Sequence, residues 1–325
     1  MASPARRVAV APAPPDRLRE ALLHVLEAVD WRDALRGQRR VLLKPNLGFD
    51  LPHPGSVTSP AVLAALVDLL CDHGYEVLIV EADQVLVDME RAAALAGVPA
   101  LCRRRGVHWV NLSRHPYRTV GPVHPDAPLP LRLPELIGQY PLIDLPVLKT
   151  HAKTTVSLAI KNLWGLLPKD RHHLHPWLTE ALRCLLADAT PALCVLDATV
   201  ALEGDGPKTG LPRRVDHLLA ARDAWRLDAV AAHWMGFDPS AIPHLAACAP
   251  PDAAALTDIA GDLPAMEPFR PAGHNLVSRV EETVRALPGG RRLLRSPALH
   301  LATAGAWLWY RVWAQAKRRS PTAAM

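Results

Sequence analysis

The sequence predicts an α/β protein: a mostly parallel sheet flanked by helices, with a Trp-rich helical tail at the C-terminus. Two observations lead to this fold class. Short runs of β-branched and aliphatic residues alternate with helical patterns, as a parallel sheet with crossover helices requires. The 325 residues are 50% hydrophobic and 21% charged, a composition that can bury a sizeable core. This composition excludes an intrinsically disordered chain.

The first third of the chain alternates predicted strands with predicted helices. Asp16 stands before an apolar stripe at helical spacing, where it suits a helix cap. Ser59 and Pro60 suit the N-cap and first position of another helix, which stops near Gly74. In order, the expected elements are strands at residues 7–10, 41–43, 77–80 and 107–112, and helices at residues 16–29, 59–74 and 92–105.

The rest of the chain continues this alternation after a Pro-rich stretch, residues 113–134, which we expect to be an irregular surface excursion. Gly236 follows the last predicted helix, at a place where glycine ends helices well. The expected elements are a strand at 142–148, a helix at 155–166, a basic His-rich loop at 168–176, a helix at 177–187, a strand at 192–196, a turn-rich loop at 204–212 and a helix at 227–235.

The domain organisation that we expect is one α/β unit over residues 1–290, followed by a basic, Trp-rich helix over residues 291–325. The apolar part of this tail is interrupted by His300 and Arg311 and is too short to span a bilayer comfortably. Two alternatives remain for it. The helix docks on the protein, or it makes peripheral contact with a membrane through residues 298–319, where Trp and basic side chains are favoured.

Cysteine usage and charge narrow the class of protein. The five cysteines include no Cys-x-x-Cys pair, so we expect neither a zinc ribbon nor a ferredoxin-type run. No secretory signal pattern is visible, and we expect a cytoplasmic protein or, on the second alternative for the tail, a membrane-peripheral one. The net charge of +5 is a modest excess. Its basic residues are not clustered with aromatics outside the tail, so we predict no specific nucleic-acid partner.

Polar side chains follow four of the predicted strands. In open parallel sheets, ligands bind outside the carboxyl ends of the strands. The polar residues at these ends are Lys44, Asn46, Glu81, Asp83, Lys149, Thr150, His151, Asp197 and Glu203. We therefore expect a single site at this edge of the sheet.

The densest candidate is the segment that begins at Lys149. Ammonium, hydroxyl, imidazole and amide groups suit an anion such as a carboxylate or a phosphate. His151 is the candidate general acid or base, because its ordinary pKa lies near neutrality. With Lys149 and Asp197 it makes up the predicted catalytic set. The predicted ligand-binding residues are Lys44, Asn46, Thr150, Thr154, Lys161, Asn162, His175 and Glu203.

Two loops offer further chemistry. The His-rich loop before Pro176 suits either a metal or, as we favour, a basic loop that closes over an anion through His175. Its histidines lack a helical metal-binding spacing, so metal and cofactor stay undetermined. Asp197 and Glu203 suit orientation of a base or a metal. The segment 204–210 has glycines but fails the P-loop pattern, because Lys208 and Thr209 precede its last glycine.

Several motifs occur here in a specific order and spacing. They are Leu43-Lys44-Pro45-Asn46, Thr58-Ser59-Pro60, Leu148-Lys149-Thr150-His151, Ala159-Ile160-Lys161-Asn162-Leu163-Trp164-Gly165, Leu196-Asp197, Glu203-Gly204-Asp205-Gly206-Pro207, Asp228-Ala229-Val230-Ala231 and Met235-Gly236. On these residues the chain resembles domain-of-unknown-function family 362 over residues 41–245. Many members look like an α/β domain coupled to a ferredoxin-type iron–sulfur module, whose Cys-x-x-Cys run this sequence does not contain. The chain is also distantly similar to the N-terminal part of nickel-pincer lactate racemases, which implies carboxylate chemistry.

Our leading hypothesis is a protein that binds, and acts on, an anionic small molecule or cofactor at the strand ends. The alternative is a non-catalytic binding or assembly protein associated with a membrane through its C-terminal helix. The sequence leaves the substrate, the reaction and the oligomeric state open.

Overall fold

The computed structural model describes residues 6–50, 52–84, 87–253 and 258–273, and five further positions: 283, 284, 287, 305 and 312. Met1–Ala272 form one compact unit and Gly273–Met325 a second. The expected tail helix over residues 291–325, with its proposed membrane contact at 298–319, lies outside the described residues except for positions 305 and 312. Within the described part, no helix has the length and apolar character needed to cross a membrane.

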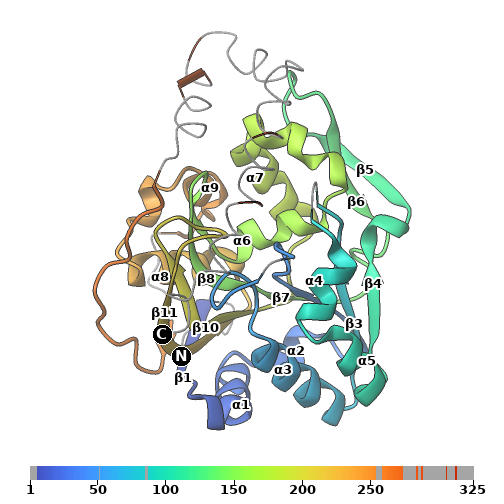
Figure 1. Ribbon diagram of the computed structural model, residues 1–325, viewed down its shortest axis with the longest axis vertical. Coiled ribbons are helices and arrows are strands. Elements are labelled where there is room, and N and C mark those ends of the chain that lie inside the picture. The colour runs from blue at the N-terminus through green and yellow to red at the C-terminus, as the bar shows by residue number, and fades with distance from the viewer. Residues whose placement is uncertain are drawn as a thin grey trace. The chain divides into compact units, whose positions relative to one another are not determined.

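The first unit is built on a ten-stranded sheet, in the described residues, that is mixed but mostly parallel (Figure 1). Its strands are β1 (Arg7–Pro12), β2 (Arg40–Pro45), β3 (Glu76–Glu81), β4 (His108–Asn111), β7 (Leu142–Leu145), β8 (Val147–His151), β9 (Thr155–Ser157), β10 (Leu193–Glu203), β11 (Leu211–Ala221) and β12 (Asp258–Ala260). The main order is β12-β1-β11-β10-β7-β2-β3-β4, and β8 pairs with both β10 and β9. The neighbours from β10 to β4 all run parallel, which confirms the predicted fold class.

Helices cover the sheet in two groups (Figure 1). They are α1 (Leu18–Ala28), α2 (Trp31–Ala34), α3 (Pro60–Asp72), α4 (Met89–Leu95), α5 (Val98–Arg105), α6 (Ala159–Asn162), α7 (Leu178–Asp188), α8 (Ala224–Trp234) and α9 (Pro243–Cys248). α3 packs against α1 and α5, whereas α6, α7, α8 and α9 pack against one another. The second group, with the sheet beneath it, encloses the main apolar core.

Several local predictions are confirmed. Ser59 is the N-cap of α3 and Pro60 its first residue. The apolar stripe of this helix, which includes Leu63 and Leu66, is fully buried. Gly236 follows α8 with a φ of +88°, the left-handed conformation that glycine adopts most easily at a helix end.

The predicted strand 142–148 is wrong as one element, because Pro146 divides it. β7, before the proline, lies between β10 and β2. β8, after it, is no longer paired with β2 and instead pairs with β10 and β9. Proline has no N–H to donate to a sheet ladder, so pairing on both sides cannot continue through this residue. The sheet therefore forks at Pro146.

The predicted helix 155–166 is also wrong at its start. Thr155 and Val156 belong to β9, which runs antiparallel to β8 with Thr155 opposite His151. These β-branched residues suit a strand better than a helix. The α-helical part is only α6, and a 3-10 helix, Leu163–Leu166, follows it. Lys161 is therefore the third residue of a short helix and does not lie two turns along a long one.

Other boundaries differ because local geometry overrides the apolar pattern. Gly97, with a φ of +78°, divides the predicted helix 92–105 into α4 and α5. Asp16 does not cap α1; it lies in a 3-10 helix, Pro15–Arg17, that precedes it. The supposed irregular stretch 113–134 contains an antiparallel hairpin, β5 (Tyr117–Pro122) and β6 (Pro130–Pro134).

Two further segments expected to be loops are regular. The predicted strand 192–196 continues as β10 to Glu203, and the chain returns as the antiparallel β11, which the sequence pattern did not reveal. The His-rich segment forms a 3-10 helix, Lys169–Trp177. The hairpin matters for the site, because it places Asp197 in the middle of a strand and Glu203 at its end.

Candidate functional site

Asn162 on α6 is the centre of a buried polar network at the carboxyl end of β2. Its Oδ1 accepts hydrogen bonds from Lys44 Nζ at 3.3 Å and from Asn46 Nδ2 at 3.0 Å. Its Nδ2 donates to Asp144 Oδ1 at 2.8 Å. Two strands, β2 and β7, and the helix α6 thus meet at one amide group, whose donor and acceptor are both satisfied.

Lys44 lies within an ion pair that solvent does not reach. Its Nζ is 3.0 Å from Glu81 Oε2, and both side chains are essentially fully buried. The backbone of Gly165 passes directly over this pair, so a Cβ at position 165 would lie 2.2 Å from Glu81 Oε1. The glycine of the Trp164-Gly165 motif is therefore required by the close approach of this backbone to the pair.

Lys149 extends the network toward β8. Its Nζ donates to Asn46 Oδ1 at 3.1 Å and to the Ser56 carbonyl at 2.6 Å. We call the connected set the Asn162 network, and it consists of Lys44, Asn46, Glu81, Asp144, Lys149 and Asn162. The structure thus brings together four predicted site residues from three separate segments of the sequence.

Positive charges are concentrated around this network. Burial, and then the charges of Lys161, Lys208 and Lys44, together lower the pKa of Lys149 to about 7. The pKa of Lys161 is also lowered to about 7, by burial and then by Arg171, Lys153 and Lys44. We call this set the basic cluster; it consists of Lys44, Lys149, Lys153, Lys161, Arg171, Lys208, His151 and His175.

Carboxylates act on some of these cations: the charges of Glu81, Asp83 and Asp170 oppose the burial that lowers the pKa of Arg171. Lys44 has Glu81, but the hydrogen bonds of Lys149 go to neutral oxygens. Arg171 Nη1 donates to the backbone carbonyls of Asp83, at 3.0 Å, and of Leu167. Lys161 Nζ lies 5.4 Å from the centre of the Trp164 ring and has no hydrogen-bond acceptor among the described residues. Such a region attracts anions.

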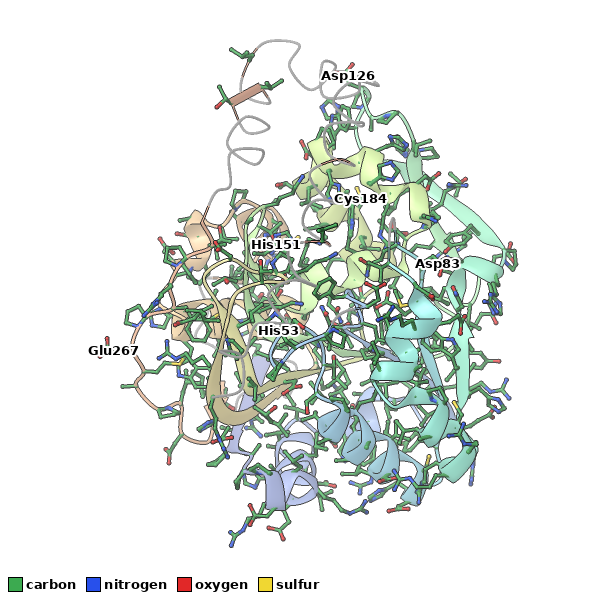
Figure 2. The ribbon with its side chains drawn as sticks, in the orientation of Figure 1. His53, Asp83, Asp126, His151, Cys184 and Glu267 are labelled. Carbon is green, nitrogen blue, oxygen red and sulfur yellow. The ribbon has the colours of Figure 1, made fainter. Side chains whose placement is uncertain are left out.

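Two histidines belong to the basic cluster. His151 lies near the middle of the view in Figure 2. Its Nδ1 accepts the backbone N–H of Lys153 at 2.9 Å. His175 Nδ1 lies 3.1 Å from the carbonyl oxygen of His172, and its ring lies 5.5 Å from that of Trp164. Burial first, and the surrounding positive charges second, lower the pKa of both imidazoles well below the ordinary value.

Asp197 lies beside the network, and its carboxylate accepts hydrogen bonds from two backbone N–H groups and one hydroxyl. Its Oδ2 accepts the N–H of Ser59 at 2.8 Å, and its Oδ1 accepts the N–H and hydroxyl of Thr199. The Ser59 end of α3 also adjoins Thr58, whose Oγ1 accepts the N–H of Asn46. Asp197 therefore fixes the loop that contacts Asn46 and Lys149, and its catalytic role stays a prediction.

The side chains of three other predicted ligand-binding residues bind groups of this chain outside the Asn162 network. Glu203 Oε2 pairs with Arg213 Nη1 at 3.1 Å, with Arg270 also nearby. Thr150 Oγ1 donates to the carbonyl of Gly204 at 2.9 Å, and Thr154 Oγ1 to that of Val156 at 2.9 Å. No described contact joins these three side chains to the Asn162 network, and their ligand roles stay predictions.

Sequence reasoning missed Asp144 and Asp228 as site residues. Asp144 is a charged residue inside an apolar strand, which was an available signal. Asp228 on α8 accepts the N–H groups of Ala159 and Ile160, at 2.7 and 2.9 Å, and so holds the start of α6. That role depends on a contact 69 residues away in the chain and has no local signature.

The described residues contain no group of three or more His, Cys, Asp and Glu side chains placed to hold a metal ion. Their donors are mostly cationic or amide groups, which suit an anion better than a cation.

Comparison with known proteins gives two findings. A family model described as a domain of unknown function (DUF362) matches residues 41–233. The thylakoid-associated protein sll1697 of Synechocystis sp. (strain ATCC 27184 / PCC 6803 / Kazusa) is 32% identical over 223 residues, which are 64% of this chain and 66% of that relative. The match thus spans slightly less than two thirds of the relative's length. No solved structure matches the chain.

Proposed function

The chain belongs to the DUF362 family of domains of unknown function, and we propose that its α/β unit binds an anionic small molecule, a carboxylate or a phosphate, at the basic cluster and acts on it. One observation carries this proposal. Lys149 and Lys161 are brought together with neutral oxygens or a ring as their described partners, and the charges of Lys161 on Lys149 and of Arg171 on Lys161 add to the burial that lowers both pKa values. An anion among them offsets the part of this shift that is due to charge, and so raises both pKa values.

The proposal separates two kinds of residue. Lys161 offers a charge without a hydrogen-bond partner in the described residues, so it is the natural ligand contact. Lys149 and Asn46 are already hydrogen-bonded to each other and form the preorganised part of the site. The ligand therefore meets donors that are fixed before it arrives, which lowers the ordering cost of binding.

Isothermal titration calorimetry of the full chain tests this function, with inorganic phosphate, acetate and succinate as probes. We expect at least one of these anions to bind and Lys161→Met to weaken its binding about tenfold, because a charge-assisted contact is lost. The matched control is Lys169→Met, an exposed lysine on the neighbouring 3-10 helix, which should bind as the unaltered chain does. Absence of binding by all three anions, or equal weakening in the control, contradicts the proposal.

A second candidate function is peripheral membrane association. It is favoured by the thylakoid-associated relative and by the Trp and basic residues at 298–319. In flotation with anionic phospholipid vesicles, we expect the full chain to float with the vesicles. The full-length triple variant Trp307→Ser, Trp309→Ser, Trp313→Ser should remain in the bottom fraction of the gradient. Equal flotation of the two proteins contradicts this function. Anion binding at the basic cluster does not depend on the outcome.

A further inference from the structure

The two histidines of the basic cluster have opposite hydrogen bonds at the same ring atom. The partner of His151 Nδ1 is a backbone N–H, that of Lys153 at 2.9 Å. The partner of His175 Nδ1 is a backbone carbonyl oxygen, that of His172 at 3.1 Å. A backbone N–H only donates and a carbonyl only accepts, so these contacts fix where each ring carries its proton.

The second ring nitrogen, Nε2, follows from the first, because a neutral imidazole carries one proton. Nδ1 of His151 must have a lone pair, so in the neutral ring the proton is on Nε2. Nδ1 of His175 must carry the proton, so the lone pair is on Nε2. Neither Nε2 has a hydrogen-bond partner in the described residues, and both side chains are half-buried. The cluster therefore presents one N–H donor and one imidazole lone pair to whatever binds there.

The neutral forms are maintained first by burial and then by the charges that face each ring. His151 is faced by Lys161, Lys149, Lys153 and His175, in addition to its burial. His175 is faced by Lys153, Lys161, His172 and Arg171. A second N–H proton on either ring would make it an imidazolium and add positive charge to a region that is already strongly positive. Lys161 and Lys153 act on both rings, which places the two histidines around the same group of charges.

We propose that His175 is the proton acceptor and His151 the hydrogen-bond donor of this site, and that its ligand is an oxyanion bearing a transferable proton. This assignment rests on the proposed anion-binding function and adds a division of roles to it. The proton leaves an O–H or C–H of the ligand for Nε2 of His175, which becomes imidazolium. The electron pair stays on the ligand, where an oxygen accepts the Nε2–H of His151. Return of the proton from His175 restores both rings.

The basic cluster makes this base dependent on the ligand. Without an anion, the neighbouring cations disfavour an imidazolium at position 175. The negative charge of a bound anion offsets those cations, so the basicity of His175 rises when the substrate is in place. The prediction of His151 as general acid or base is thereby narrowed: its ring is held as a donor.

Nitrogen NMR of the full chain, with ¹⁵N-labelled histidine, tests the assignment. Loss of signals in His151→Gln and His175→Gln identifies the two rings. At pH 7 we expect the proton of His175 on Nδ1 and that of His151 on Nε2. The proposal is overturned if the two rings share one tautomer, if the tautomers are exchanged, or if either ring is an imidazolium at this pH.

Acylation by diethyl pyrocarbonate provides a second readout, because the reagent attacks an unprotonated ring nitrogen. We expect His175 to react at least tenfold faster than His151, whose lone pair is held by Lys153 N–H. Added inorganic phosphate should slow the reaction at His175 but not at His24, an exposed histidine on α1. Reaction at His151 that equals or exceeds that at His175 overturns the division of roles. Unchanged acylation in phosphate, with the expected tautomers, counts instead against the anion-binding function.

Discussion

Asp144 has one carboxyl oxygen in the Asn162 network and one that contacts no donor. Its Oδ1 accepts from Asn162, whereas the buried Oδ2 has no hydrogen-bond partner among the described residues. Burial raises the pKa of this carboxyl to about 7, with Lys44 and Asn162 opposing the shift. A protonated Asp144 is therefore the form that the fold favours under mildly acidic conditions.

The stability of the protein should show this titration. The pKa of Asp144 is raised on folding, so the folded state binds its proton more tightly than the unfolded state, and the contribution is lost as pH rises from about 4 to 7. Relative to Asp144→Asn, we expect the unaltered chain to lose about 3 kcal/mol of unfolding free energy over this range, as measured by urea denaturation. The control Asp205→Asn, at an exposed position, should differ from the unaltered chain by a constant amount. A constant difference for Asp144→Asn as well would contradict the titration.

Gly165 gives a steric prediction at the same scale. A methyl group there would lie 2.8 Å from Lys44 Cε and Nζ and closer still to Glu81 Oε1. Because these atoms belong to a fully buried ion pair, whose displacement would disturb the pair, we expect Gly165→Ala to lower the unfolding free energy by about 1–3 kcal/mol. Gly121→Ala on β5 is the control, since no atom lies within 4 Å of its Cβ position. Equal unfolding midpoints for the two variants in urea would count against this crowding.

Individual residues were predictable where the site is made of residues that follow strands. Lys44, Asn46 and Lys149 are predicted on that basis and Asn162 as part of the polar segment after Lys149, and the structure joins the four through hydrogen bonds. Glu203 was chosen on the same basis but pairs with Arg213, because β10 continues further than the apolar run indicates. What a side chain binds depends on the strand that arrives beside it, and that strand, β11, had no clear pattern.

At the scale of elements, α6 is held by a residue from another helix. Asp228 accepts both N–H groups at its start, and α6 carries Lys161 and Asn162. We expect Asp228→Ala to lower the unfolding free energy by about 1–3 kcal/mol, because two buried N–H groups lose their acceptor. We also expect it to weaken anion binding in calorimetry, because both site residues lose their support.

The matched control for this prediction is Asp238→Ala. Asp238 accepts an N–H from Ser240 at an exposed 3-10 helix, so its removal should cost about 0.5–1 kcal/mol and leave anion binding unchanged. If Asp228→Ala binds anions as tightly as this control does, α6 does not need Asp228 to place its side chains.

Element boundaries were predictable where a residue has one strong preference. Ser59 and Pro60 began α3 as expected, since their cap and first-turn preferences agree. Two of the errors occurred at Pro146 and Thr155, where a single residue changes the pairing of a whole segment. An apolar run of four to eight residues does not show on which side its partner strand lies, so sequence periodicity could not reveal the fork.

At the scale of the whole molecule, the pH dependence of the unfolding free energy should reveal the charge balance of the basic cluster. The pKa values of Lys149 and Lys161 are lowered on folding, so the folded state binds fewer protons than the unfolded state above pH 7, and stability rises with pH there. Relative to Lys161→Met, we expect the unaltered chain to gain unfolding free energy between pH 7 and 8.5 in urea denaturation.

Inorganic phosphate provides the control for this pH dependence. An anion bound at the cluster keeps the lysines protonated, so the gain with pH should become smaller in phosphate than in chloride of equal ionic strength. A gain of the same size in both salts would show that phosphate leaves the lysines unaffected.

The fork at Pro146 has a consequence for the speed of binding. Asn46 extends from β2 and Lys149 lies on β8, the two strands that diverge there, so their separation is determined by the sheet. The two groups are hydrogen-bonded to each other before a ligand arrives. Encounter, rather than rearrangement, should then limit association, and the association rate constant should fall steeply as ionic strength rises.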